Sequence, residues 1–336
     1  MRVLQKIGFT MAALAASTSA HALEKVSFGT NWVAQAEHGG YYQALADGTY
    51  EACGLEVEIK PGGPQANNRI LLPVGKIDFL MGGNMLQAFS AVEQNIPTTV
   101  VAAHFQKEPQ IIMSHPDAGH DTWESLKDIK ILIGKGGFNS FYQWMIAEYG
   151  FSADQVRPYT YNAAPFIANK DMGQQGYVTS EPFAIETEGG FKPNIFLIAD
   201  YGYNTYGTTV ETRNELIETK PDVVKCFVDG SATGWVNFLY GDNSKALDLI
   251  KKDNPGMSDE QLAFSIEKMK EYGIVDSGDS LTMGIGAMTD ERNKSFFDKM
   301  VAAGVVHADV DYTKAYTLDF VNKGVGVDLK SKLVGN

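Results

Sequence analysis

Aromatic and hydrogen-bonding side chains follow the first strand pattern of the chain. Val26 and Phe28 alternate with polar residues as in a strand, and Asn31, Trp32 and His38 come soon after them. An indole presents a flat face on which a ring can stack, and an amide or an imidazole forms directional hydrogen bonds. This stretch therefore predicts a binding site for a planar, polar molecule in a loop between a strand and a helix.

Further residues of these types stand beside other strand patterns. Three of them follow or end the predicted strands 77–81, 156–161 and 176–180, and the carboxyl ends of parallel strands meet where open α/β folds bind their ligands. We expect four more residues to contact the ligand, namely Tyr41, Asn84, Tyr161 and Glu181. Glu181 has a second interpretation, as a favourable charge at the start of a helix that begins with Pro182.

A glycine-rich loop, residues 134–137, follows one strand pattern and opens a helix. It lacks the third glycine of the dinucleotide fingerprint, because position 139 is Asn, and it lacks the Gly-Lys-Ser/Thr ending of a phosphate loop. The loop is either an ordinary tight turn or a helix start whose free N–H groups face a polar or anionic ligand group. On the second interpretation Phe138, Asn139 and Ser140 belong to the site.

No catalytic or metal-binding motif accompanies these residues. The sequence contains neither Gly-x-Ser-x-Gly nor His-Glu-x-x-His, and no cysteine has a reactive setting. His115 and His120 lie five apart across a loop, without the pattern of a zinc site. We therefore expect no metal and no cofactor, and a binding protein rather than an enzyme.

Strand and helix patterns alternate along the first 200 residues, which predicts an α/β fold with a parallel, doubly wound sheet. We divide the chain into lobe 1, residues 23–114 and 201–336, and lobe 2, residues 115–200, inserted into lobe 1. Two chain crossings, near Ser114 and near Tyr201, would form the hinge.

The part of the chain after residue 201 is predicted to be helical. One helix follows the capping box that begins at Ser258, and another opens at Thr289.

The first 22 residues have the pattern of an export signal. Arg2 and Lys6 precede an apolar run over 7–16, and Ala20 and Ala22 form an A-x-A cleavage site. The apolar run is shorter than the roughly 20 residues that span a bilayer. We expect cleavage after Ala22, a periplasmic location and no stable membrane insertion.

Charge and cysteine content limit the partners. The chain of 336 residues has a formal net charge of −13 and no run of Lys and Arg, which argues against nucleic acid or an anionic membrane as a partner. The two cysteines, Cys53 and Cys226, both fall in lobe 1, and an exported protein permits a disulfide. The sequence leaves open whether they pair.

Several motifs resemble a known family, the nitrate/sulfonate/taurine-type solute-binding proteins, and within it the branch that binds thiamine pyrimidine precursors. The similar segments are 31–32, 38–44, 54–57, 61–63, 75–79, 82–83, 134–140, 176–182 and 311–322. The segment 33–37 departs from the pattern, which usually has a proline-asparagine pair there, and we expect the protein's own specificity to reside in it.

The resemblance implies a type II periplasmic binding protein with two doubly wound lobes and a two-crossing hinge. It implies a small-molecule ligand, typically an aminopyrimidine, with a riboflavin-binding relative also similar, and delivery to an ABC permease and its ATPase by a monomer. In such proteins an aromatic near the Trp32 position stacks on the ring, and a carboxylate near the Glu181 position binds its polar edge.

Two alternatives remain. One is a small anion such as a sulfonate, held at the helix start near Ser140, with Arg69 and Lys135 as the available cations. The other is a periplasmic pyrimidine-processing enzyme that uses His38 and Glu181 as acid and base. The pyrimidine synthases that share the fold carry a cysteine-rich iron motif that this sequence lacks.

Overall fold

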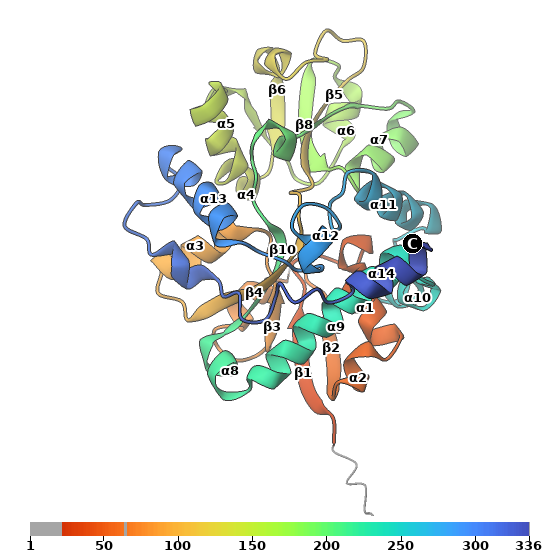
Figure 1. Ribbon diagram of the computed structural model, residues 1–336. Coiled ribbons are helices and arrows are strands. Elements are labelled where there is room, and N and C mark those ends of the chain that lie inside the picture. The colour runs from red at the N-terminus through yellow and green to blue at the C-terminus, as the bar shows by residue number, and fades with distance from the viewer. Residues whose placement is uncertain (1–21, 64–65, 336) are drawn as a thin grey trace, which may run out of the picture.

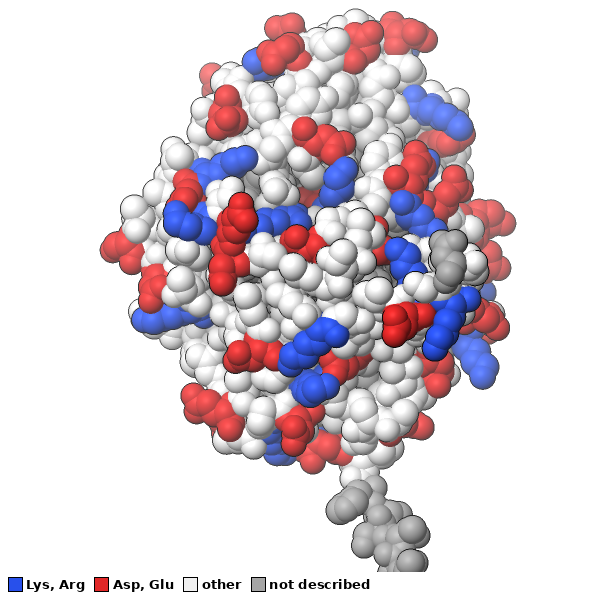
Figure 2. All heavy atoms as spheres, in the orientation of Figure 1, with Lys and Arg blue, Asp and Glu red and all other residues white. Residues whose placement is uncertain are grey.

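The computed structural model describes residues 22–63 and 66–335 (Figure 1). The predicted export signal lies outside these residues, apart from Ala22. The described chain folds into two α/β lobes, one above the other in Figure 1, and each contains a five-stranded sheet. Acidic and basic side chains are interspersed over the face drawn in Figure 2, without a patch of one sign.

The sheet of lobe 1 has the strand order β2-β1-β3-β10-β4. Its strands are β1 (Glu24–Gly29), β2 (Leu55–Lys60), β3 (Phe79–Met81), β4 (Thr98–Phe105) and β10 (Gly207–Arg213). β1 pairs in parallel with β2 and β3, with Val26 opposite Val57, as expected for a parallel sheet. β10 lies between β3 and β4 and runs antiparallel to both.

The sheet of lobe 2 has the order β7-β6-β8-β5-β9. Its strands are β5 (Gln110–Ser114), β6 (Lys130–Ile133), β7 (Val156–Pro158), β8 (Met172–Tyr177) and β9 (Asn194–Leu197). β6 is parallel to β7 and β8, whereas β5 is antiparallel to β8 and β9. The prediction of purely parallel sheets was therefore wrong for one strand in each lobe. The chain enters each of these strands, β10 and β5, from the other lobe. They therefore run antiparallel to neighbouring strands that the chain reaches through a crossover helix.

Strand β10 was missing from the prediction, which treated the chain after residue 201 as helical. The reason is its composition, Gly-Thr-Thr-Val-Glu-Thr-Arg, which shows no apolar alternation. Sheet neighbours on both sides bury it nonetheless, including Glu211, which is 1% exposed. Its carboxylate accepts two hydrogen bonds from the Arg69 guanidinium, at 3.0 and 2.6 Å, which compensate the buried charge.

The strand pairings also shift one predicted boundary. β5 was assigned to lobe 1, but its partners β8 and β9 belong to the second sheet. The chain thus crosses between the sheets over residues 106–109 and again over residues 198–206.

Helices cover both sheets. Those that follow lobe 1 segments are α1 (Gly39–Ala46), α2 (Thr49–Ala52), α3 (Met85–Glu93), α8 (Asn214–Thr219), α9 (Pro221–Tyr240), α10 (Ser244–Asp253), α11 (Asp259–Glu271), α12 (Ser280–Met283), α13 (Asp290–Ala302) and α14 (Val327–Val334), with 3-10 helices η1 (Ala36–His38), η2 (Asn68–Leu71) and η6 (Tyr312–Ala315). Those of lobe 2 are α4 (Lys135–Phe138), α5 (Phe141–Tyr149), α6 (Ala164–Ala168) and α7 (Glu181–Gly189), with η3 (Glu124–Asp128), η4 (Ala153–Gln155) and η5 (Ile198–Tyr201). The predicted caps are confirmed, since the Ser258 and Thr289 side chains accept from the third backbone N–H of α11 and α13. Within the described ranges, no helix is both long and apolar enough to cross a membrane.

The longest helix, α9, packs directly against α1. A Cβ atom added at Gly40 would lie 2.2 Å from Cγ of the buried Trp235, and one at Gly39 would lie 2.1 Å from the Phe238 ring. The two glycines after His38 are therefore required for packing, and they fix the end of the loop that carries Trp32.

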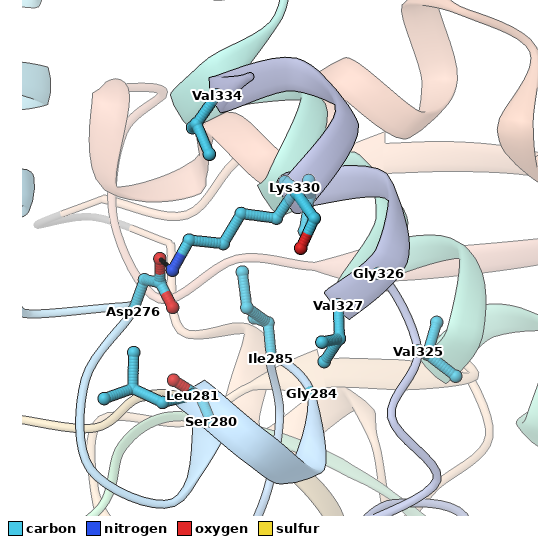
Figure 3. A pocket seen from close by; sticks show the side chains of 12 residues that line it. Asp276, Ser280, Leu281, Gly284, Ile285, Val325, Gly326, Val327, Lys330 and Val334 are labelled. Carbon is cyan, nitrogen blue, oxygen red and sulfur yellow. Dashed lines mark ion pairs between the residues drawn. The ribbon is translucent and has the colours of Figure 1, made fainter. Parts of the chain in front are cut away.

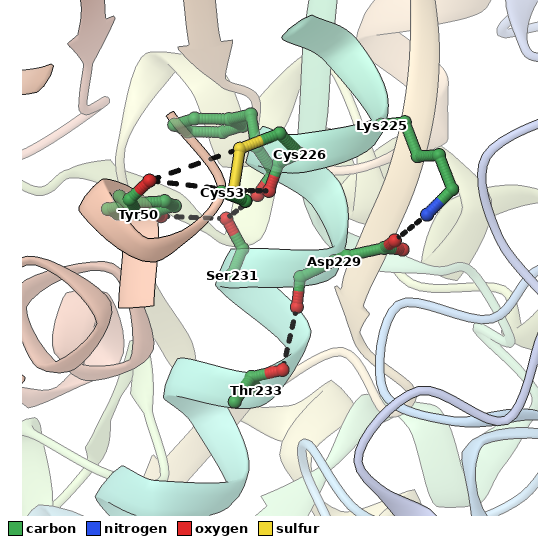
Figure 4. The surroundings of a disulfide bond; sticks show 8 residues. Tyr50, Cys53, Lys225, Cys226, Asp229, Ser231 and Thr233 are labelled. Atoms are coloured by element: carbon green, nitrogen blue, oxygen red, sulfur yellow. Dashed lines mark hydrogen bonds and ion pairs between the residues drawn. A yellow bond between two sulfur atoms is a disulfide. The ribbon is translucent and has the colours of Figure 1, made fainter. Parts of the chain in front are cut away.

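A disulfide joins Cys53, at the end of α2, to Cys226 in α9, with their Cα atoms 5.8 Å apart (Figure 4). The question that the sequence left open is thus answered in favour of pairing. The bond connects residues 173 positions apart and ties the first helices to α9.

Replacing Gly40 by alanine is expected to lower the free energy of unfolding by about 1–3 kcal/mol, because the methyl group overlaps the Trp235 ring. Thermal unfolding measures this effect. Gly136→Ala is the matched control, since an added Cβ there meets nothing within 4 Å. Equal melting temperatures for the two variants would contradict the packing argument.

Replacing both cysteines by serine is expected to lower the free energy of unfolding by about 2–4 kcal/mol, because the long loop is no longer closed in the unfolded chain. Guanidinium unfolding of the oxidised protein and the double variant provides the comparison. A reducing agent should destabilise the wild type and leave the double variant unchanged. A difference below about 0.5 kcal/mol would be inconsistent with a stabilising role.

Candidate functional site

A cavity of about 230 Å³ lies between the two lobes. Lobe 1 contributes Asn31, Trp32, Gln35, Glu37, Met81, Phe105 and Thr208, and lobe 2 contributes Gln110, Tyr161, Gln175, Gly176, Tyr177, Ser180 and Glu181. None of these described lining residues carries a positive charge. The structure thus brings together four of the predicted site residues, Asn31, Trp32, Tyr161 and Glu181.

Two aromatic rings from opposite lobes meet at this cavity. The ring centroids of Trp32, in the loop after β1, and Tyr161, in the loop after β7, are 5.0 Å apart with an interplanar angle of 46°. A ligand ring held between them would need a separation of about 7 Å, twice the contact distance of carbon atoms. The lobes must therefore move apart slightly, or the rings turn, to accept a ligand.

The backbone is strained at two lining residues. Tyr161 has a φ of 62° and Thr208, at the start of β10, has a φ of 45°. Residues with a side chain rarely adopt this left-handed conformation, and such strain concentrates at binding sites. Tyr161 is also 61% exposed, so burial of its ring does not account for the strain.

Glu181 combines the two interpretations that the sequence offered. It is the first residue of α7. The strand before it, β8, ends at Tyr177, whereas the predicted strand extended to residue 180. Its carboxylate accepts a hydrogen bond from the Tyr177 backbone N–H at 2.6 Å and also lines the cavity. Burial raises the pKa of Glu181, against the lowering effect of this hydrogen bond.

A second carboxylate, Glu37, was not predicted. It lies in η1, is 2% exposed and accepts a hydrogen bond from the Thr179 hydroxyl of the other lobe. Burial raises the pKa of Glu37 to about 7, and the Glu181 charge adds to this. The sequence offered one indication that Glu37 belongs to the site, namely its position within 33–37, where the chain departs from the family pattern.

Primary amides supply most of the remaining polar groups. Gln110 donates to the Gly176 carbonyl at 2.8 Å, and Gln175 accepts from the Gly134 backbone N–H at 2.7 Å. These bonds hold both side chains at the cavity. The glycine-rich loop is thus connected to the site through Gln175, and the Gly134 N–H is already bonded.

Three predicted residues of the first lobe lie away from the cavity lining. His38 is fully buried, neither of its ring nitrogens has a partner among the described residues, and burial lowers its pKa to about 3. The Tyr41 hydroxyl is 2.8 Å from Nδ1 of the buried His104. Asn84 caps α3 and donates to the buried Glu108 at 3.1 Å. Their types and spacing suited a binding site. In the structure, however, His38 and Tyr41 are buried where α1 packs, and Asn84 forms the N-cap of α3.

The three predicted residues of the glycine-rich loop also lie outside the cavity lining. Most of this loop is itself helical, as α4, and a second helix, α5, follows it; Phe138 ends α4, and Asn139 and Ser140 lie between the two helices. The Ser140 hydroxyl donates to the Gly136 carbonyl at 2.7 Å, which stabilises the turn. None of the three side chains is among the residues that line the cavity.

A second cavity, of about 190 Å³, lies beneath the C-terminal helix α14 (Figure 3). Its main charged groups already pair, since Lys330 Nζ is 2.6 Å from Asp276 and Tyr240 donates to the same carboxylate. The rest of its lining is chiefly aliphatic. The inter-lobe cavity, which polar side chains from both lobes line, is the better candidate site. As for metals, the described ranges contain no group of three or more His, Cys, Asp and Glu that could hold an ion.

Comparison with solved structures gives the class. The periplasmic aliphatic sulphonate binding protein SsuA from Escherichia coli is similar with a TM-score of 0.61 at 16% identity, over 88% of this chain and 92% of that chain. The desulfurization enzyme DSZB is similar with a TM-score of 0.56 at 11% identity, over 90% and 99% of the two chains. The chain therefore has the type II periplasmic binding protein fold, as predicted, and this fold also occurs in an enzyme.

Comparison of sequences gives the family. A family model described as "NMT1/THI5 like" matches residues 35–241, more than half of the chain. The chain belongs to this NMT1/THI5-like family. The riboflavin-binding protein RibY from Chloroflexus aurantiacus is 24% identical over 312 residues, which cover 90% of this chain and 87% of that protein.

The strain at Tyr161 can be measured by removing the ring in two ways. Tyr161→Gly is expected to be about 1 kcal/mol more stable than Tyr161→Ala, because glycine adopts a positive φ without steric cost. Chemical denaturation of the two variants gives the difference. If alanine is the more stable, the left-handed backbone at this position is not a source of strain.

Proposed function

We propose that this protein is the periplasmic substrate-binding component of an ABC importer and that it captures a small planar heteroaromatic molecule between its lobes. The observation that supports this most is the pairing of Trp32 and Tyr161 from opposite lobes at a cavity of amides and carboxylates. Lobe closure would cover both faces of a ring, while Asn31 and Glu181 bind its polar edge.

The size and polarity of the cavity favour a single ring. Its volume of about 230 Å³ is below the roughly 300–1,000 Å³ typical of sites for drug-sized ligands. A thiamine pyrimidine precursor has the size of one ring and an amino group that can donate to Glu181. The similarity to a riboflavin-binding protein supports a heteroaromatic ligand more generally.

A sulfonate ligand is the second candidate, because similar folds bind sulfonates. The charges of the cavity argue against it. Glu37 and Glu181 line the site without a Lys or Arg among its described lining residues, and an anion would be repelled. The helix start at α4 does not offer a free Gly134 N–H either, since this group donates to Gln175.

An enzymatic role is the third candidate, because the structure is similar to that of a desulfurization enzyme. An acid–base pair of His38 and Glu181 would require both side chains at the cavity. His38 is buried away from the lining, and its lowered pKa of about 3 keeps the imidazole neutral at ordinary pH. We therefore propose binding without turnover, with delivery of the ligand to a permease and its ATPase by a monomer.

Trp32→Ala is expected to weaken binding of the thiamine pyrimidine precursor by at least about tenfold, because the ring loses one stacking face. Isothermal titration calorimetry of the purified protein measures the dissociation constant. Trp32→Phe keeps an aromatic face and serves as the control, with a loss of about threefold or less. A Trp32→Ala loss of less than about threefold, or about 0.7 kcal/mol, would show that the indole does not stack on the ligand.

A further inference from the structure

Glu37 is a buried carboxylate in an unusual position. Its side chain is 2% exposed and lines the inter-lobe cavity. Oε1 accepts the hydrogen bond of the Thr179 hydroxyl, and no other side chain among the described residues donates to this carboxylate. One oxygen of a nearly fully buried acid is thus available to a molecule in the cavity.

The surroundings of Glu37 contain no compensating positive charge among the described residues. Glu181, at the start of α7, carries a charge of the same sign, and Tyr177, at the end of β8, lies close to Glu37, Glu181 and Glu108. His38, the next residue of η1, is buried and neutral. A buried carboxylate is costly unless it is paired or protonated, so a cationic ligand would relieve an existing cost.

We propose that Glu37, together with Glu181, makes the cleft selective for a planar ligand with a positively charged edge that carries several N–H donors, such as an amidine or an aminopyrimidinium. This inference rests on the proposed function, because it specifies the ligand class of the same cleft. Two carboxylates at one edge match two or more N–H donors, and charge-assisted hydrogen bonds are about twice as strong as neutral ones.

The same carboxylate connects the two lobes. Thr179, which donates to Glu37, lies in lobe 2, and its backbone carbonyl accepts from the Ser265 hydroxyl of α11 at 2.7 Å. Beside these bonds the rings of Phe183 in α7 and Phe264 in α11 have centroids 5.5 Å apart. A ligand bound to Oε2 would thus contact a side chain that forms part of the inter-lobe contact, so selection of the ligand and closure of the lobes involve one residue.

Proton release provides an independent signature. Burial raises the pKa of Glu37 to about 7, so near pH 7 the carboxyl is partly neutral. A cation binds the ionised form and lowers this pKa, which releases protons. Affinity for a strongly basic ligand should therefore rise as pH increases through about 7 and approach a constant value above it.

Three probes with one benzene ring test the proposal: benzamidine, benzamide and benzenesulfonate. Calorimetric titration at pH 8 is expected to give a dissociation constant for benzamidine at least about tenfold lower than for benzamide, and no binding of benzenesulfonate. In Glu37→Gln, which keeps the shape and an acceptor for Thr179, the preference for benzamidine over benzamide should fall to about threefold or less. Glu267→Gln removes the same charge from an exposed position on α11 and should behave as wild type.

Each other result has a defined meaning. Equal binding of benzamidine and benzamide, or a preference that survives in Glu37→Gln, overturns this inference and leaves the proposed function standing, provided that Trp32→Ala weakens both probes. Tightest binding of benzenesulfonate, or binding of none of the three, contradicts both. Titration at pH 7 in buffers of different ionisation enthalpy should show proton release with benzamidine in the wild type and a smaller release in Glu37→Gln. Melting temperatures identify any variant that does not fold.

Discussion

Strand β10 is the element on which the arrangement of the lobes depends. It returns the chain from lobe 2 into the first sheet, between β3 and β4 and antiparallel to both. Because an interior strand bonds on both sides, this return is fixed by the sheet. Glu211 in its middle is held by Arg69 from η2, so the strand also anchors the segment before β3. The second crossing and Thr208, which lines the cavity, are positioned as a consequence.

The electrostatics of the cleft depend on acidic side chains from both lobes. The buried Glu37 and the half-buried Glu181 line the cavity, and a third acid, the buried Glu108, lies close to Tyr177 beside them. Burial raises the pKa of all three. A site built this way has a cost in the empty protein that a suitable ligand reduces, so the same groups can supply both affinity and selectivity.

Much of the fold could be predicted from local patterns. Apolar alternation gave β1, and side-chain caps gave the starts of α11 and α13. β10 could not be found in this way, because its threonines and Glu211 do not alternate with apolar residues and are buried by neighbours distant in sequence. The assignment of β5 failed for a similar reason, since a strand's sheet is decided by its pairing and not by its own residues.

The sequence by itself determined that Trp32, Asn31, Tyr161 and Glu181 follow strands and that the chain forms an α/β fold, because short-range patterns of residues carry this information. The periplasmic binding protein type came from the resemblance of longer motifs to a known family. Only the tertiary structure decided that Glu37 joins the cavity and that His38, Tyr41 and Asn84 do not line it. The physical reason is that burial and hydrogen bonding between the lobes depend on how α1 packs on α9 and how Thr179 meets η1, contacts that no local pattern specifies.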